Sequence, residues 1–98
     1  MTFVQIIEFR SSKIDEMEAV GNEWETATAG KRTVQRRYLA EDRDHPGRYF
    51  NIVFFDSYDD AMRNSALPET DALSNKMMGL ADGPPTFYNL DIRDAREY

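Results

Sequence analysis

The 98-residue sequence has no cysteine and only one histidine. The absence of cysteine excludes a disulfide framework, a thiolate nucleophile and a thiolate-ligated metal site. It also favours a reducing compartment, so we expect a cytoplasmic protein. No apolar run approaches the roughly 18 residues that a membrane-spanning helix requires, and the N-terminus lacks the basic and apolar regions of a signal peptide. We expect no membrane partner.

Positive charge is also scarce, because 12 Lys and Arg residues face 18 Asp and Glu residues, which gives a net charge of −6. An acidic chain repels phosphate backbones, so we expect no binding to nucleic acid. The single histidine, His45, lies in the turn sequence Asp44–Gly47, where an exposed loop residue is the ordinary case. No spacing of His, Asp or Glu is typical of a metal site. We therefore expect no metal and no other cofactor.

The length and the 41% hydrophobic content fit one domain over residues 1–98. Alternating or continuous apolar segments predict strands, and apolar residues at helical spacing predict helices. The expected strands are Phe3–Phe9, Arg32–Ala40, Arg48–Phe55 and Thr86–Ile92; the expected helices are Lys13–Thr28, Ser57 to about Ala66, and a second piece from Pro68 to about Leu80. Ser11 and Ser12 are expected to cap the first helix.

The order of these elements is β-α-β-β-α-β, which predicts an α+β, ferredoxin-like fold with a four-stranded antiparallel sheet and the helices on one face. The first and third strands lie in the middle of that topology, and they are also the most apolar strands. Arg32–Ala40 alternates and carries charges, as an edge strand does. Glu41–Gly47 holds turn residues and is expected to form a hairpin loop.

Both faces of the expected sheet carry apolar residues, although the helices can cover only one face. One face holds Phe3, Ile7, Phe9, Val53, Phe55 and Phe87; the other holds Val4, Ile6, Phe50, Ile52, Phe54, Tyr88, Leu90 and Ile92. An exposed apolar face of this size is rarely found on a monomer, so we expect a homodimer that packs sheet against sheet. A monomer with one hydrated face is the alternative.

Three segments carry a family resemblance: Phe55–Met62 (FDSYDDAM), Asn64–Thr70 (NSALPET) and Asp82–Asp91 (DGPPTFYNLD). With them the whole chain resembles the dimeric α+β barrel superfamily, and within it a bacterial subgroup of antibiotic biosynthesis monooxygenase-like proteins. The resemblance implies a cofactor-independent monooxygenase in which a deprotonated, electron-rich aromatic or polyketide-like substrate reacts directly with O₂. Heme-degrading members of the superfamily share an Asn, Trp and His trio that this sequence does not match.

Polar residues on one face of the expected sheet form the candidate site: Gln5, Asn51, Asn89 and Asp91 share parity with apolar neighbours, and a hairpin pairing Tyr38 with Tyr49 adds both tyrosines and Arg36. A slip of one residue in that hairpin would send Arg36 and Tyr38 to the other face. Amides, phenols and a guanidinium in an apolar cavity can orient a small aromatic ligand. A hydrogen-bond network across the dimer is the alternative reading.

Roles follow for the individual residues of this site. Arg36, Tyr38, Tyr49 and Asn51 are the candidate donors to a developing oxyanion, and Asp91 is the candidate base; Arg36 and Asp91 are therefore the candidate catalytic residues. Trp24 is either the core anchor of the first helix or one wall of a cleft that binds the aromatic ligand. The alternative function is a non-catalytic dimer that binds a small molecule or serves as an accessory subunit.

Overall fold

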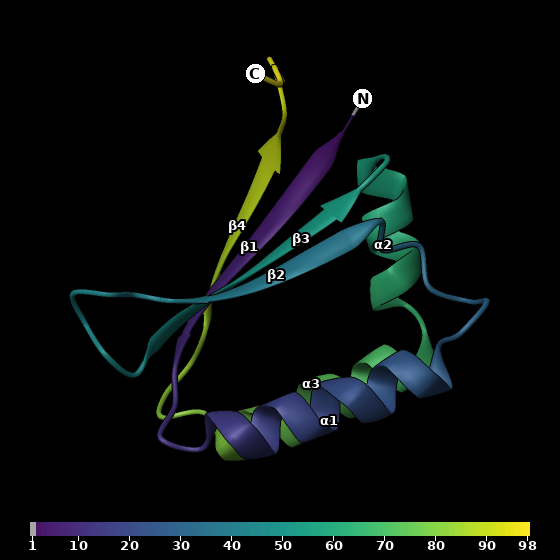
Figure 1. Cartoon of the computed structure of the whole chain (residues 1–98). Helices are drawn as coiled ribbons and strands as arrows, with labels where there is room; N and C mark the ends of the chain where they lie inside the picture. The colour runs from purple at the N-terminus through teal and green to yellow at the C-terminus, as the bar shows by residue number, and fades with distance from the viewer. Residues whose placement is uncertain (1) are drawn as a thin grey trace.

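The computed structural model describes residues 2–98, which form one sheet with its helices on one side (Figure 1). The elements are β1 (Phe3–Arg10), α1 (Ile14–Ala27), β2 (Arg36–Glu41), β3 (Arg48–Phe55), α2 (Tyr58–Ser65), α3 (Pro68–Leu80) and β4 (Thr86–Asp91). All strand pairs are antiparallel, in the order β2-β3-β1-β4. The predicted ferredoxin-like fold is confirmed, with β1 and β3 in the centre and β2 at an edge.

Local chemistry explains where several elements begin. The Ser57 hydroxyl accepts a hydrogen bond from the backbone N–H of Asp60 at 3.1 Å, which caps α2, and Pro68 occupies the first turn of α3. β2 begins at Arg36 instead of Arg32. The reason is that Arg32 is still tied to α1, because its backbone N–H donates to the Thr28 carbonyl at 3.0 Å.

The pairing registers place the odd-numbered and the even-numbered side chains of the strands on opposite sides of the sheet. Every paired residue keeps the parity of its partner, as in Phe3 opposite Phe55 and Asp91, so odd-numbered residues of all four strands share one side. Phe3 and Phe55 of this side pack with Ala61 of α2. We call this the helix-facing side, and we call the opposite side, with the even-numbered residues, the open side.

The helix layer covers the helix-facing side incompletely. α1 and α3 lie side by side and pack mainly against each other, whereas α2 runs beside β3 (Figure 1). No residue of α3 is buried, and its apolar residues Leu73, Met77 and Leu80 are half-buried. Phe87 is on the helix-facing side of β4 and remains 54% exposed.

A buried serine ties the end of β1 to the rest of the fold. The predicted capping role of Ser11 and Ser12 is wrong in detail, since Lys13 is the N-cap residue and α1 has no side-chain cap. The Ser11 hydroxyl accepts a hydrogen bond from the Lys13 N–H at 2.9 Å and donates one to the carbonyl of Leu80, also at 2.9 Å. It therefore joins the start of α1 to the end of α3.

Replacing Ser11 with Ala removes both hydrogen bonds and leaves a partly buried carbonyl and N–H without their partner. We expect the free energy of unfolding to fall by about 1–3 kcal/mol. Urea denaturation followed by circular dichroism measures this change, with Ser12→Ala at the neighbouring exposed position as the control. Equal stability of the two variants would contradict a structural role for the Ser11 hydroxyl.

Candidate functional site

Two amide side chains meet on the helix-facing side of the sheet. Gln5 lies opposite Asn89, and the Gln5 Nε2 donates a hydrogen bond to the Asn89 Oδ1 at 3.0 Å. Gln5 is half-buried and Asn89 is exposed. The two amides thus satisfy one another within a single chain, and each keeps further donors or acceptors for a ligand.

A second polar contact lies toward the β2 edge on the same side. The Arg37 guanidinium donates a hydrogen bond to the Asn51 Oδ1 at 3.3 Å. Arg37 lies opposite Val53, next to the pair formed by Leu39 and Asn51. Sequence reasoning missed Arg37, because the hairpin register that it assumed turned this residue away from Asn51.

The hairpin register corrects two of the predicted site residues. Tyr38 pairs with Ile52, and Arg36 pairs with Phe54, so the assumed pairing of Tyr38 with Tyr49 is wrong. Arg36 and Tyr38 therefore lie on the open side. There the Arg36 guanidinium lies 5.0 Å from the centre of the Phe54 ring, which is a cation–π distance.

Asp91 is on the helix-facing side, opposite Phe3, as its parity predicted. Its side chain is exposed at the end of β4. β4 and β2 are the two edges of the sheet, so Asp91 and Arg36 lie on different edges and different sides. One chain does not bring these two predicted catalytic residues together.

Tyr49 is on the helix-facing side and is the most enclosed polar side chain among the predicted site residues. Its ring stacks on Phe9 with a centroid separation of 5.6 Å. Burial, together with the negative charge of Glu41, raises the pKa of the Tyr49 phenol. The phenol therefore stays protonated near neutral pH and can donate a hydrogen bond.

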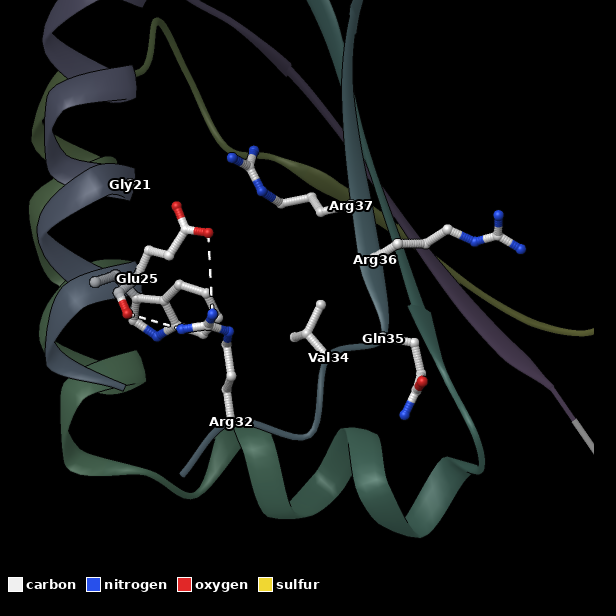
Figure 2. Close-up of a pocket in the computed structure, with 8 residues that line it drawn as sticks. Gly21, Glu25, Arg32, Val34, Gln35, Arg36 and Arg37 are labelled. Atoms are coloured by element: carbon white, nitrogen blue, oxygen red, sulfur yellow. Dashed lines mark hydrogen bonds and ion pairs between the residues drawn. The ribbon is translucent and has the colours of Figure 1, made fainter. Parts of the chain in front are cut away.

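A cavity of about 260 Å³ opens between α1 and the chain that leads into β2. Trp24 and Arg32 contribute to its wall, and the Arg32 guanidinium lies 6.0 Å from the Trp24 ring centre. Figure 2 shows Arg32 and Arg37 reaching into this space from different segments, while Arg36 points to the other side of β2. The Trp24 indole N–H donates to the Thr70 hydroxyl at 2.9 Å, so Trp24 both anchors α1 on α3 and lines the cavity.

The open side of the sheet is apolar over all four strands. One row across the sheet consists of Tyr38, Ile52, Ile6 and Tyr88, and the next row consists of Arg36, Phe54, Val4 and Leu90. Tyr38 is 52% exposed and Leu90 is 45% exposed. Within residues 2–98, no helix covers these rows, since all of the helices lie on the other side (Figure 1); Val4 alone is buried, among its neighbours in the sheet.

A charged cluster borders this apolar surface. The Arg48 guanidinium donates to Glu8 at 3.1 Å and to Asp42 at 2.9 Å, and the Tyr88 hydroxyl donates to Glu8 at 3.3 Å. The hydrogen bond from Arg48 lowers the pKa of Glu8. The pKa of Asp42 is lowered first by the backbone N–H of Asp44 and then by Arg48.

His45 lies exposed in the hairpin loop, and its imidazole Nδ1 lies 3.2 Å from the carboxylate of Asp42 in that loop. Within residues 2–98, no three His, Asp or Glu side chains gather as they would around a metal ion. None of the helices in this part of the chain has the length and hydropathy needed to cross a membrane.

No protein-family model matches the sequence, and no curated protein matches it either. Solved structures show the fold: the α+β, ferredoxin-like fold of this chain is similar to that of proteins described as candidate antibiotic biosynthesis monooxygenases. SnoaB from Streptomyces nogalater, described as a cofactor-independent oxygenase, aligns with a TM-score of 0.80 and 19% identity over 96% of this chain and 95% of its own.

Two further structures show the same fold. A protein from Caulobacter crescentus, named as a candidate antibiotic biosynthesis monooxygenase, aligns with a TM-score of 0.81 and 16% identity over 95% of this chain and 91% of its own. Rv0793 from Mycobacterium tuberculosis aligns with a TM-score of 0.80 and 15% identity over 99% of this chain and all of its own. The predicted resemblance is therefore confirmed for the fold.

The Arg48 cluster gives the protein a specific dependence on pH. The folded-state pKa values of Glu8 and Asp42 lie below their ordinary values, so their stabilisation is present near neutral pH and is lost as the pH falls through the lowered values. We expect Arg48→Gln to be less stable than the wild type at pH 7, and this difference to shrink progressively below about pH 5.

Urea denaturation at fixed protein concentration from pH 7 to about pH 3 measures the effect. Arg93→Gln, in the exposed C-terminal segment, is the charge-matched control and should follow the wild type at every pH. A difference between wild type and Arg48→Gln that stays constant across this range would contradict the proposed ion pairs.

Proposed function

We propose that this protein is a homodimer that binds a flat aromatic molecule on the helix-facing side of its sheet and oxidises it as a cofactor-independent monooxygenase. The observation that carries this proposal is a band of bonded polar side chains beside a cavity. Gln5 bonds to Asn89 and Arg37 bonds to Asn51, on a side where Phe87 is still exposed. Polar groups on a partly open apolar surface are what a small-molecule site requires.

The reaction that fits these groups needs no protein-borne redox centre. A phenol with a free para position combines with one O₂ to give a quinone and one water, so one oxygen atom enters the ring and the other leaves as water. The protein would hold the substrate, stabilise negative charge on its oxygen and limit access of water. Asn51, Arg37 and the protonated Tyr49 phenol are the proposed hydrogen-bond donors. Asp91 is not part of this group, because it lies opposite Phe3, four residues along β1 from the Ile7–Asn51 pair.

Two observations support the homodimer. The apolar rows of the open side have no cover within residues 2–98, and the described chain exposes 6972 Å² of surface. A compact monomer of this mass exposes about 5,800 Å². The excess is larger than the roughly 800 Å² that one partner contributes to a standard interface. We propose that a second copy covers this side, which would close a barrel between two sheets.

A non-catalytic binding dimer is the second candidate function. It is favoured by the exposure of Asp91, because the described residues place no buried carboxylate beside Asn51 to accept a proton from a bound phenol. In that case the same amides and arginine would hold a ligand without oxidising it. The two functions differ in a measurable quantity, the uptake of oxygen.

The open side yields the first test of the proposed function. Leu90→Glu places a carboxylate at the β4 end of one apolar row, at a position that is 45% exposed, so we expect the dimer to dissociate into chains of 11.4 kDa. Size-exclusion chromatography with light scattering measures the mass. Met78→Glu is the matched control, since Met78 is 71% exposed on α3 and lies away from the open side. A wild-type monomer at micromolar concentration would contradict the proposal.

The oxidation itself is tested with naphthols and dihydroxynaphthalenes that have a free para position. We expect protein-dependent uptake of one O₂ per quinone formed, without release of hydrogen peroxide. Asn51→Ala should lower kcat by about 100-fold, which is the effect of losing one donor to a developing oxyanion. Asn75→Ala, at an exposed amide of α3, is the control. Saturable binding of these phenols with no oxygen uptake would reject the enzyme in favour of the binding dimer.

A further inference from the structure

Three arginines line the cavity between α1 and β2, and two of them, Arg32 and Arg37, point into it, which gives it an excess of positive charge within an acidic chain. Arg32 enters from the segment before β2, and Arg37 enters from β2 itself (Figure 2). Glu25 is the acidic residue of the cavity wall. Its carboxylate lies 4.0 Å from the Arg32 guanidinium, which is the outer limit of an ion pair.

The Arg37 guanidinium has unused donors. A guanidinium offers five N–H groups, and the hydrogen bond to Asn51 uses one of them. Within residues 2–98, Arg37 makes no ion pair with a carboxylate. By contrast, Arg48 of the open side is bonded to both Glu8 and Asp42. The cavity therefore presents a cation whose charge the protein itself does not match.

The remaining wall of the cavity is suited to an aromatic ring. Trp24 contributes its indole, over which the Arg32 guanidinium lies at 6.0 Å from the ring centre, and Val34 adds an apolar side chain. The volume of about 260 Å³ lies just below the roughly 300 Å³ at which pockets for drug-sized ligands begin, so it suits a ligand of one or two rings. A planar carboxylate is the anion whose geometry matches the guanidinium fork.

We propose that this cavity binds a planar aromatic carboxylate, with the carboxylate on Arg37 and Arg32 and the ring against Trp24. This inference rests on the proposed function in one respect: it assumes that the ligand binds on the helix-facing side of the sheet. The Arg37–Asn51 hydrogen bond links the carboxylate site to the amide that is proposed to contact the reacting oxygen. Substrates of the proposed reaction are therefore hydroxylated aromatic acids.

The single tryptophan provides a direct readout of binding. Trp24 gives one indole N–H signal in an ¹H–¹⁵N spectrum; its side chain lines the cavity, and its N–H is bonded to the Thr70 hydroxyl. The probes are 2-naphthoate and 2-naphthamide, which have the same rings but differ in charge. Both lack a phenol, so neither is a substrate for the proposed oxidation. We expect 2-naphthoate to shift the Trp24 signal saturably and to bind at least about tenfold more tightly than 2-naphthamide.

Arg37→Gln should weaken the binding of 2-naphthoate by about tenfold and leave the binding of 2-naphthamide unchanged, because the substitution removes the charge and keeps a similar side-chain length. Arg37→Lys should retain part of the affinity. Arg43→Gln, in the exposed hairpin loop, is the charge-matched control and should bind 2-naphthoate like the wild type. The remainder of the ¹H–¹⁵N spectrum shows whether each variant is folded.

Three results would overturn the carboxylate site. The first is equal affinity for the two probes, and the second is an equal loss of affinity for both probes in Arg37→Gln. The third is that neither probe shifts the Trp24 signal. The proposed oxidation fails by a different result, the absence of oxygen uptake with phenols. Charge-dependent binding of 2-naphthoate without that activity would leave the carboxylate site standing and reject only the oxygenase.

Discussion

Successive side chains of a β-strand point to opposite sides of the sheet, and most features of this protein depend on that alternation. Odd-numbered residues of all four strands lie on the helix-facing side, and even-numbered residues form the open side. Because the registers preserve parity across the whole sheet, two neighbouring residues such as Arg36 and Arg37 have unrelated surroundings. The amides and the cavity lie on one side, and an apolar surface without intramolecular cover lies on the other.

The parts of the fold that depend on local pattern could be predicted from the sequence. The high apolar content of the segments that form β1 and β3 placed them in the middle of the sheet. Ser57 with its acidic following turn indicated the start of α2, and Pro68 indicated the start of α3. Shared parity also placed Gln5, Asn51 and Asn89 on one side, because β1, β3 and β4 pair over most of their length.

The parts that depend on distant contacts could not be predicted. Sequence alone does not fix how many residues a hairpin loop uses, and the pairing of Tyr38 with Ile52 follows from hydrogen bonds that close the Asp42–Arg48 turn. That register exchanged Arg36 for Arg37 beside Asn51. Similarly, the exposure of Asp91 depends on where α1 and α3 lie relative to β4. The Ser11 hydroxyl makes two hydrogen bonds, and the one to the Leu80 carbonyl joins residues that are 69 positions apart in the chain.

The alternation along β2 also restricts how this sequence can change by insertion and deletion. Adding or removing one residue within β2 would turn Arg37 and Leu39 outward and bring Arg36 or Tyr38 to the helix-facing side, so a single event would alter both surfaces. The exposed loop between Asp42 and Gly47 can change in length without changing which residues of β2 face each side of the sheet. Descendants of this chain should therefore vary in length at the loop and keep the length of β2 constant.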